Sequence, residues 1–262
     1  MLLSNPLVRK PSLGAPLSVN TTDPLTRGMI SCIPLLTGTG VPVDIMTRRH
    51  VNGGNASWSV AGSAGPSAEA WSFTNATTTD LAFSTAGSAF TVAQFCNVIT
   101  VTPIATIGRW NYTSETVNTG WTMNIITSPG AAFVWDVNNN NGSANYQLAS
   151  SVPATVGNHT IVGTSDGIGR RCIYVDGKFS GSTATNPTPL AATGDFSYPT
   201  SGNVYAYLVA VWNRDLSPFE VEAFHMNPMR LFTGTFSSGF ISGVFGPGFG
   251  GRVPNLGPIL AQ

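Results

Sequence analysis

The carboxylates of this chain are too few and too scattered to predict acid–base catalysis on a sugar. Its glutamates are Glu69, Glu115, Glu220 and Glu222. A glycosidase needs two carboxyl groups that face each other across the scissile bond. Glu220 and Glu222 lie two residues apart in a segment with helical signals, so their side chains point in different directions. We therefore expect no glycosidase activity.

The histidines do not predict a hydrolytic triad either. His50, His159 or His225 would have to supply the base of a Ser-His-Asp arrangement. No Gly-x-Ser-x-Gly elbow occurs at a strand-to-helix turn, which is where such a nucleophile is normally held. His159 begins an apolar strand pattern and His225 falls in a predicted helix, so structural roles are favoured for both. We interpret the chain as a protein that is not an enzyme.

Metal and cofactor sites are not predicted. Cys32, Cys96 and Cys172 are widely spaced, with no Cys-x-x-Cys pair that would indicate zinc. Their apolar surroundings favour buried, reduced thiols. Calcium would need six to eight oxygen ligands, and the nearest candidates are Asp166, Asp176 and the run of asparagines at 138–141. Because no acidic cluster is present, turn formation explains these residues better, and we expect no metal and no cofactor.

A non-catalytic carbohydrate site is the more promising chemistry. Aromatic rings can stack on sugars while neighbouring asparagine and aspartate side chains bond to the hydroxyl groups. Such rings occur beside asparagine-rich segments, and the candidate glycan-binding residues are Trp110, Tyr112, Trp135 and Tyr146. The favoured alternative for these rings is packing in the core or at an interface.

The overall composition restricts the partners. The chain has 262 residues, of which 9% are charged, and its formal net charge is zero. A nucleic-acid binder needs a basic face, so we expect no nucleic-acid partner. No stretch reaches the ~20 apolar residues of a membrane-spanning helix, and the N-terminal Met-Leu-Leu-Ser-Asn-Pro does not resemble a secretory signal, so we expect no membrane partner. Zero net charge favours association, which points to a homo-oligomer or a member of a larger assembly.

Short apolar or alternating runs predict the elements that position these residues. Gly, Pro, Asn and Ser punctuate the runs, as expected for an all-β sandwich. About eleven strands follow from this pattern, over residues 29–36, 57–60, 70–73, 80–84, 90–101, 105–110, 120–126, 131–137, 158–166, 170–178 and 204–212. Asp176-Gly177 predicts a type I′ hairpin turn.

One short helix is predicted after the last strand. Ser217 is its N-cap, Pro218 its first residue, and Glu220 the partner that completes a capping box. Asn227-Pro228 ends the helix, because proline cannot continue it.

Several motifs together resemble a known family. They are Phe90-Thr-Val-Ala-Gln-Phe95, His159-Thr-Ile-Val-Gly-Thr-Ser165, Arg171-Cys-Ile-Tyr-Val-Asp-Gly-Lys178, Trp212-Asn-Arg-x-Leu-Ser-x-x-Glu220 and Asn227-Pro-x-x-Leu-Phe232. In order and spacing they resemble laminin-G-like, concanavalin-A-like jelly rolls of the kind found in structural proteins of tailed phages. The resemblance implies an all-β fold, a two-sheet antiparallel jelly-roll sandwich with one short C-terminal helix.

Two terminal segments flank the predicted jelly roll of residues 28–232. Prolines interrupt residues 1–27, and residues 233–262 place phenylalanines on a glycine-rich backbone, so both are predicted to be extended arms. Their apolar side chains need a surface to pack on, and we expect it to be a neighbouring subunit. The predicted partner-binding residues are Leu2, Leu3, Leu7, Val8, Phe236, Phe240, Phe245 and Phe249.

From the resemblance we expect a structural virion protein of a tailed bacteriophage. It would be a capsid decoration or head-fibre component, made in the bacterial cytoplasm, whose arms dock on the major capsid protein or other virion subunits. The alternative is a carbohydrate- or receptor-binding module of a tail fibre. A cellular adhesin is a third interpretation, against which the absence of a recognisable signal peptide counts.

Overall fold

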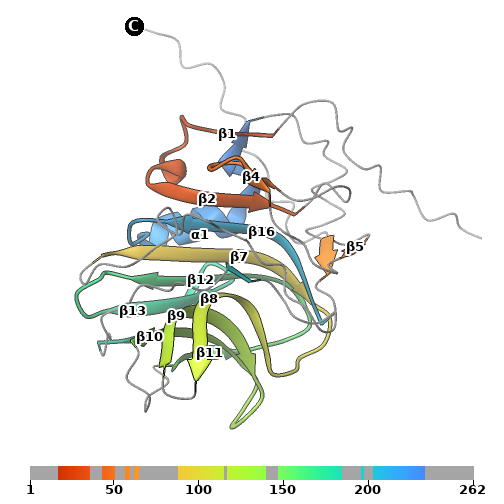
Figure 1. Cartoon of the computed structure of the whole chain (residues 1–262), viewed down its shortest axis with the longest axis vertical. Coiled ribbons are helices and arrows are strands. Elements are labelled where there is room, and N and C mark those ends of the chain that lie inside the picture. Colours follow the sequence, from red (N-terminus) through yellow and green to blue (C-terminus); the bar gives the residue numbers. More distant parts are fainter. Residues whose placement is uncertain are drawn as a thin grey trace, which may run out of the picture.

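The structure is a computed structural model that describes residues 17–35, 43–50, 57–59, 62–64, 88–114, 117–139, 147–184, 196–197 and 203–233. Within these residues the fold prediction is confirmed: the chain is mostly β, its paired strands are antiparallel, and one short α-helix lies near the C-terminal end. Figure 1 shows two stacked sheets, with the helix and the N-terminal elements on the far side of the larger one.

The larger sheet runs in the order β14-β13-β12-β7-β16-β6-β5, and β2 also pairs with β16. Its strands are β2 (Met29–Pro34), β5 (Ser57–Ser59), β6 (Gly62–Ala64), β7 (Phe90–Val98), β12 (Gly157–Ser165), β13 (Arg171–Val175), β14 (Lys178–Thr183) and β16 (Val204–Trp212). Consecutive residues of β7 and β16 are buried, because this sheet is covered on both faces. That explains why these two segments read as continuous apolar runs rather than as alternating ones.

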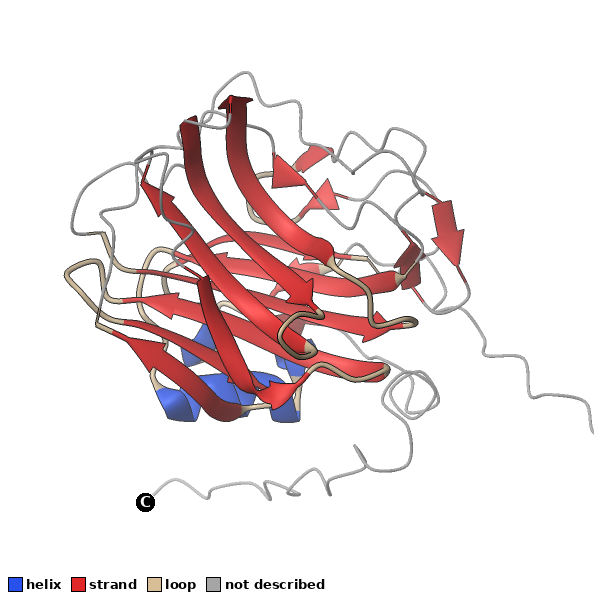
Figure 2. Ribbon diagram, turned by 90° about the horizontal axis from the view of Figure 1, so that it is seen from below, coloured by secondary structure: helices blue, strands red, loops and turns tan. Residues whose placement is uncertain are grey.

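The smaller sheet has the order β11-β10-β9-β8-β15. Its strands are β8 (Ile104–Ser114), β9 (Val117–Ile126), β10 (Ala132–Asn139), β11 (Gln147–Pro153) and β15 (Phe196–Ser197). Figure 2 is drawn from below the view of Figure 1, with the helices partly hidden behind the strands.

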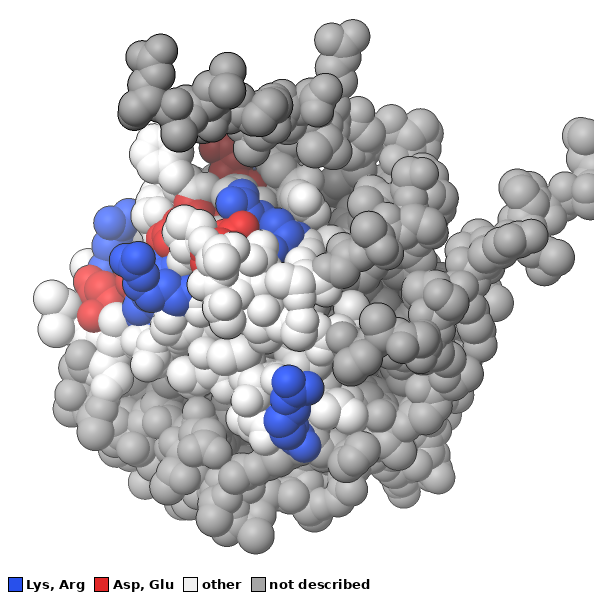
Figure 3. Space-filling view, turned by 90° about the horizontal axis from the view of Figure 1, so that it is seen from above, with Lys and Arg blue, Asp and Glu red and all other residues white. Residues whose placement is uncertain are grey.

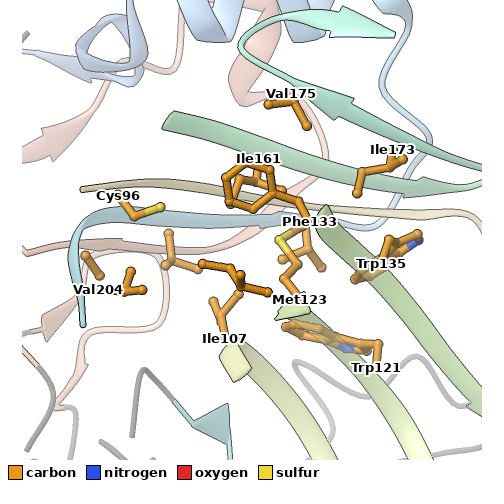
Figure 4. Packing of buried hydrophobic residues seen from close by; sticks show 14 of the residues in the cluster. Cys96, Ile107, Trp121, Met123, Phe133, Trp135, Ile161, Ile173, Val175 and Val204 are labelled. Atoms are coloured by element: carbon orange, nitrogen blue, oxygen red, sulfur yellow. The ribbon is translucent and has the colours of Figure 1, made fainter. Parts of the chain in front are cut away.

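The space between the sheets holds the main core. Alternate residues of β9 and β10 point into it, and Figure 4 shows their rings and aliphatic chains meeting those of the larger sheet. Trp135 lies at the centre, with its ring 5.7 Å from that of Phe90 and 5.9 Å from that of Trp121. Gly163 of β12 lies directly under the Trp135 indole, and a Cβ there would come within 2.4 Å of the Trp135 Cδ2 atom.

A second apolar layer covers the other face of the larger sheet. It contains α1 (Pro218–Met226), η1 (Pro24–Thr26), η3 (Pro228–Leu231), the pair β1 (Ser18–Val19) and β17 (Phe232–Thr233), and the pair β3 (Val43–Asp44) and β4 (Arg49–His50). The buried side chains Leu25, Val221 and Phe224 pack there against Trp212 and Tyr174. The indole of Trp212 also donates a hydrogen bond to the Leu25 carbonyl at 2.6 Å.

The predicted helix is confirmed in detail. Ser217 accepts a hydrogen bond from the Glu220 backbone N–H, Glu220 bonds back to the Ser217 N–H, and Pro218 is the first helical residue. The Arg214 guanidinium donates to both Glu220 carboxylate oxygens, at 2.8 and 3.0 Å. These contacts explain the Arg-x-Leu-Ser-x-x-Glu motif as a structural unit. They lower the pKa of Glu220, although its partial burial acts in the opposite direction.

The sandwich body begins earlier than predicted. Ser18 and Val19 pair with Thr233 and Phe232, and Leu25 is buried in the outer layer, so residues 18–26 are part of the body rather than of an arm. The reason is that a short apolar segment between prolines can pack on a sheet without showing the alternating or helical hydrophobic pattern that predicts a strand or a helix. The remaining residues of both predicted arms, 1–16 and 234–262, lie outside the described residues.

Most strand predictions are confirmed, and the Asp176-Gly177 turn has the predicted left-handed backbone, with φ of 51° and 75°. The prediction did not include β11, because Leu148 is the only large apolar side chain that this strand places in the core. The strands predicted at 70–73 and 80–84 lie outside the described residues.

Candidate functional site

On three neighbouring strands of the larger sheet, the side chains change from buried to partly exposed at residues that are paired with one another. On β16 the change is from Tyr207 to Tyr205, on β7 from Phe95 to Asn97, and on β12 from Thr160 to Asn158. We call Tyr205, Asn97 and Asn158 the polar row.

The register brings the row together on one face. Asn97 of β7 is paired with Asn158 on one side and with Tyr205 on the other. The preceding paired residues, Cys96 with Ala206, point into the core between the sheets. Because successive residues of a strand point to opposite faces, the polar row lies on the face that also carries α1.

The position of the helix explains why the row is accessible. His225, in the last turn of α1, lies over Thr160, with its Nδ1 atom 2.8 Å from the Thr160 hydroxyl oxygen. The helix ends at Met226, and the strand residues beyond this contact are no longer covered by it. Amide and tyrosine side chains, rather than apolar ones, occupy those places.

Tyr207 links the row to the buried layer below it. Its hydroxyl accepts a hydrogen bond from the Asn97 amide and donates one to the Asn158 carbonyl oxygen, both at 3.4 Å. Burial raises the pKa of Tyr207, and the bond from Asn97 only partly offsets this effect. The hydroxyl therefore stays protonated at neutral pH and fixes the orientation of both amides.

Beside β12, on the side away from β7, lies a cluster of titratable groups. Asp176 accepts hydrogen bonds from the His159 Nδ1–H at 3.0 Å and from the Thr160 backbone N–H at 2.9 Å. Burial alone would raise the pKa of Asp176, but these bonds and the nearby His225 lower it overall. Burial lowers the pKa of His225, and Asp176 opposes this only in part. At neutral pH the cluster therefore contains an ionised carboxylate next to an uncharged His225.

Thr155, His159 and Asp176 lie in a line that superficially resembles a catalytic triad. The His159 Nε2 atom is 3.1 Å from the Thr155 hydroxyl oxygen, but it is also 3.0 Å from the Thr155 carbonyl oxygen. Both oxygens of Thr155 therefore lie at hydrogen-bond distance from the same ring nitrogen, and this contact holds the 154–157 loop against His159. The cluster is a structural tie between that loop and the Asp176-Gly177 turn.

The residues predicted to bind a glycan are not brought together among the described residues. Trp135 is fully buried between Phe90 and Trp121, so the prediction for this residue is wrong: its ring packs in the core. Trp110 and Tyr112 belong to β8 of the smaller sheet, where the described part of the chain includes only their backbone. Tyr146 and the eight predicted arm residues lie outside the described residues.

Asp166, a candidate calcium ligand for which the sequence favours a turn role instead, has local backbone partners. The Asp166 Oδ1 atom accepts backbone hydrogen bonds from Ile168, Gly169 and Arg170, each at 2.9 Å, and so shapes the β12–β13 turn. Across the described ranges, no group of three His, Cys, Asp or Glu side chains is placed to hold a metal ion. Cys32, Cys96 and Cys172 are buried and free, as predicted.

Two ion pairs tie the N-terminal segment and the helical layer together. Arg230 bonds to Asp23 at 2.7 Å, which ties the N-terminal segment to η3, while Arg214 ties it to α1. Figure 3 views the molecule from above Figure 1. Basic and acidic side chains lie interspersed on one part of the face that it shows. Of the helices in the described residues, none has the length and apolar character to span a membrane.

Sequence reasoning did not find the polar row. One signal was present: Asn97 and Asn158 interrupt apolar strand patterns near their ends. Only the register shows that they are neighbours, and only the end of α1 shows that they are accessible.

Comparisons with known proteins identify the fold. The sequence matches no protein-family profile, and no curated protein sequence is similar to it. Several solved structures share the fold. Trypanosoma rangeli sialidase in complex with sialic acid has a TM-score of 0.58 at 15% identity over 80% of this chain and 34% of the sialidase.

 The binding domain of Paraclostridial Mosquitocidal Protein 1 has a TM-score of 0.57 at 14% identity over 78% of this chain and 53% of that domain. The binding domain of botulinum neurotoxin serotype D has a TM-score of 0.58 at 11% identity over 77% of this chain and 51% of that domain.

This chain therefore spans between about one third and one half of the length of these structures. At such low identities the likeness shows a common concanavalin-A-like sandwich fold. It does not by itself transfer a ligand or an activity, because one fold carries many functions.

Proposed function

We propose that this chain is a non-catalytic, carbohydrate-binding sandwich domain, and that the polar row contacts the sugar. The observation that carries the proposal is the register of Tyr205, Asn97 and Asn158, which places one tyrosine and two amides side by side on a partly exposed sheet face. Amide groups donate and accept hydrogen bonds at once, as vicinal sugar hydroxyls require. A tyrosine supplies an apolar ring with a polar tip.

The row is also ordered before any ligand arrives. The Tyr207 hydroxyl bonds to both asparagines, and the paired strands fix their spacing. Pre-ordered side chains lose little conformational entropy on binding, which favours affinity for a small polar ligand.

The similar structures add circumstantial support. One is a sialidase in complex with sialic acid, and another is the binding domain of botulinum neurotoxin DC in complex with SialylT. Those ligands belong to those proteins. They are the reason to include sialylated glycans among the probes for this chain.

The test is a glycan-array screen of the full chain, followed by calorimetric titration with the best glycan. Asn97→Ala and Asn158→Ala each remove hydrogen bonds worth about 1 kcal/mol net, so each is expected to weaken binding about five- to tenfold. Asn124→Ala is the matched control, since Asn124 is also partly exposed but lies on the smaller sheet. The proposal fails if no glycan binds, or if the row variants bind as tightly as the control.

We also propose that this domain operates on the virion of a tailed phage. The support is the sequence resemblance described above, whose Arg-x-Leu-Ser-x-x-Glu motif forms the Arg214–Glu220 unit at the start of α1. A full chain in which Phe236, Phe240, Phe245 and Phe249 are replaced by serine should no longer sediment with phage heads that lack this protein. Sedimentation of the variant at the wild-type level, or no sedimentation of the wild type, would contradict this assignment.

A further inference from the structure

Two exposed apolar residues follow the polar row at the ends of β7 and β12. Gly157 of β12 is paired with Val98 of β7, and this is the last pair of the two strands, so Val156 and Ile99 lie directly beyond the strand ends. Both are unusually exposed for their type, Ile99 at 43% and Val156 at 64%. We call Ile99 and Val156 the apolar ledge. Each lies two residues from its asparagine, so their Cα atoms are at most about 7 Å apart, which is within the span of one substituted sugar ring.

The ledge is held in place from both sides. The Ile99 backbone N–H donates to the Asn203 carbonyl at 2.7 Å, and the Ala154 N–H donates to the Ala131 carbonyl at 3.1 Å. The His159 Nε2 atom contacts the 154–157 loop at the Thr155 hydroxyl and carbonyl oxygens, at 3.1 and 3.0 Å. The exposed valine therefore sits on an anchored loop, and its exposure is a feature of the fold.

The surroundings of the row and the ledge indicate an uncharged contact. Asp176 and Lys178 lie on the β13–β14 turn, beside β12 and away from β7. Asp176 is already engaged by His159 and Thr160. In the described part of the chain, the side chains of the row and the ledge are amides, a phenol and aliphatic groups.

We infer that the ligand of this site is a sugar that carries an acetamido group. This inference rests on the proposed function. An acetamido group has an N–H donor, a carbonyl acceptor and a methyl group. The amides of Asn97 and Asn158 match the first two, and Ile99 with Val156 gives the methyl group an apolar surface. A plain hydroxyl at the same ring position would leave the ledge in contact with water.

The experiment compares sugar pairs that differ only in this group, using the full chain and chemical-shift titration. The probes are N-acetylglucosamine against glucose and N-acetylgalactosamine against galactose, with fucose as a sugar that carries a methyl group but no amide. Burial of one methyl group predicts that each acetamido sugar binds about fourfold more tightly than its partner. Fucose should not share this advantage.

Variants then assign the preference to the ledge. Val156→Ser and Ile99→Ser should bring the ratio of the two affinities within each sugar pair close to one. Val156→Thr keeps the shape of the side chain and should lose the preference only in part. Val152→Ser is the control, because Val152 is also an exposed valine but lies on β11 of the smaller sheet.

The possible results separate the two proposals. If sugars bind without a preference for the acetamido form, if fucose binds best, or if the preference survives both serine variants, the inference is wrong while the carbohydrate-binding proposal stands. If no sugar binds at all, the proposed function itself fails and this inference falls with it.

Discussion

Replacing Gly163 by alanine tests whether the packing of the two sheets is as tight as the structure indicates. The added Cβ would lie 2.4 Å from the Trp135 Cδ2 atom and 2.7 Å from its Cε2 atom, and unstrained Cβ atoms do not approach others so closely. The indole cannot easily move away, because the rings of Phe90 and Trp121 lie 5.7 and 5.9 Å from it on other strands. Such overpacking costs about 1–3 kcal/mol, and the short distances here place Gly163→Ala near the upper end.

For a domain of this size each kcal/mol lowers Tm by about 2–4 °C, so the expected fall is roughly 4–12 °C. Urea titration should show a lower midpoint with an unchanged slope, the sign of a stability change without a change in the unfolded state. Gly130→Ala is the matched control, since a Cβ there has no atom within 4 Å. If both variants unfold at the same midpoint, the close packing of Trp135 on β12 is refuted.

Three further predictions concern the cap, the titratable cluster and the thiols. Ser217→Ala removes the capping box and should cost about 1 kcal/mol, whereas Ser217→Asp should retain most of the stability; equal midpoints for serine and alanine would contradict the capping geometry. Burial lowers the pKa of His225 below its ordinary 6.5, so on acidification the unfolded chain protonates at this residue before the folded chain does. The free energy of unfolding should therefore be highest above pH 6.5 and fall as the pH drops from 7.5 to 5.5. His225→Gln should lose less stability over the same range in denaturant titrations, and an identical pH dependence would refute the assignment. Burial raises the pKa of Cys32 and of Cys96, so a thiol reagent should label both only after denaturant is added, and rapid labelling of the folded chain would contradict their burial.

The fold could be predicted from the sequence wherever the signal was local. The capping box of α1 is set by residues within four positions of each other, and the Asp176-Gly177 turn by two adjacent residues. The strand β11 was missed because Ser150, not an apolar residue, faces inward beside Leu148, where its hydroxyl accepts a hydrogen bond from the Phe133 N–H at 3.0 Å. A buried serine of this kind carries no pattern that alternation can detect.

The candidate site could not be predicted, because it depends on contacts between distant parts of the chain. Asn97, Asn158 and Tyr205 come together only through strand register. Their exposure depends on where α1 ends above Thr160. Trp135 shows the opposite error: asparagines follow it in the sequence and suggested a surface site, whereas Gly163 on the facing sheet leaves the space that its ring occupies in the core.

The central claim is that carbohydrate binds at the polar row, and side-chain amide spectra test it most directly. In the nitrogen–proton spectrum of the full chain, addition of the best array glycan should shift the side-chain amide signals of Asn97 and Asn158. The signal of Asn124, on the smaller sheet, should stay in place. Shifts at Asn124 without shifts at the other two would contradict the account, because they would place the sugar on the opposite side of the sandwich.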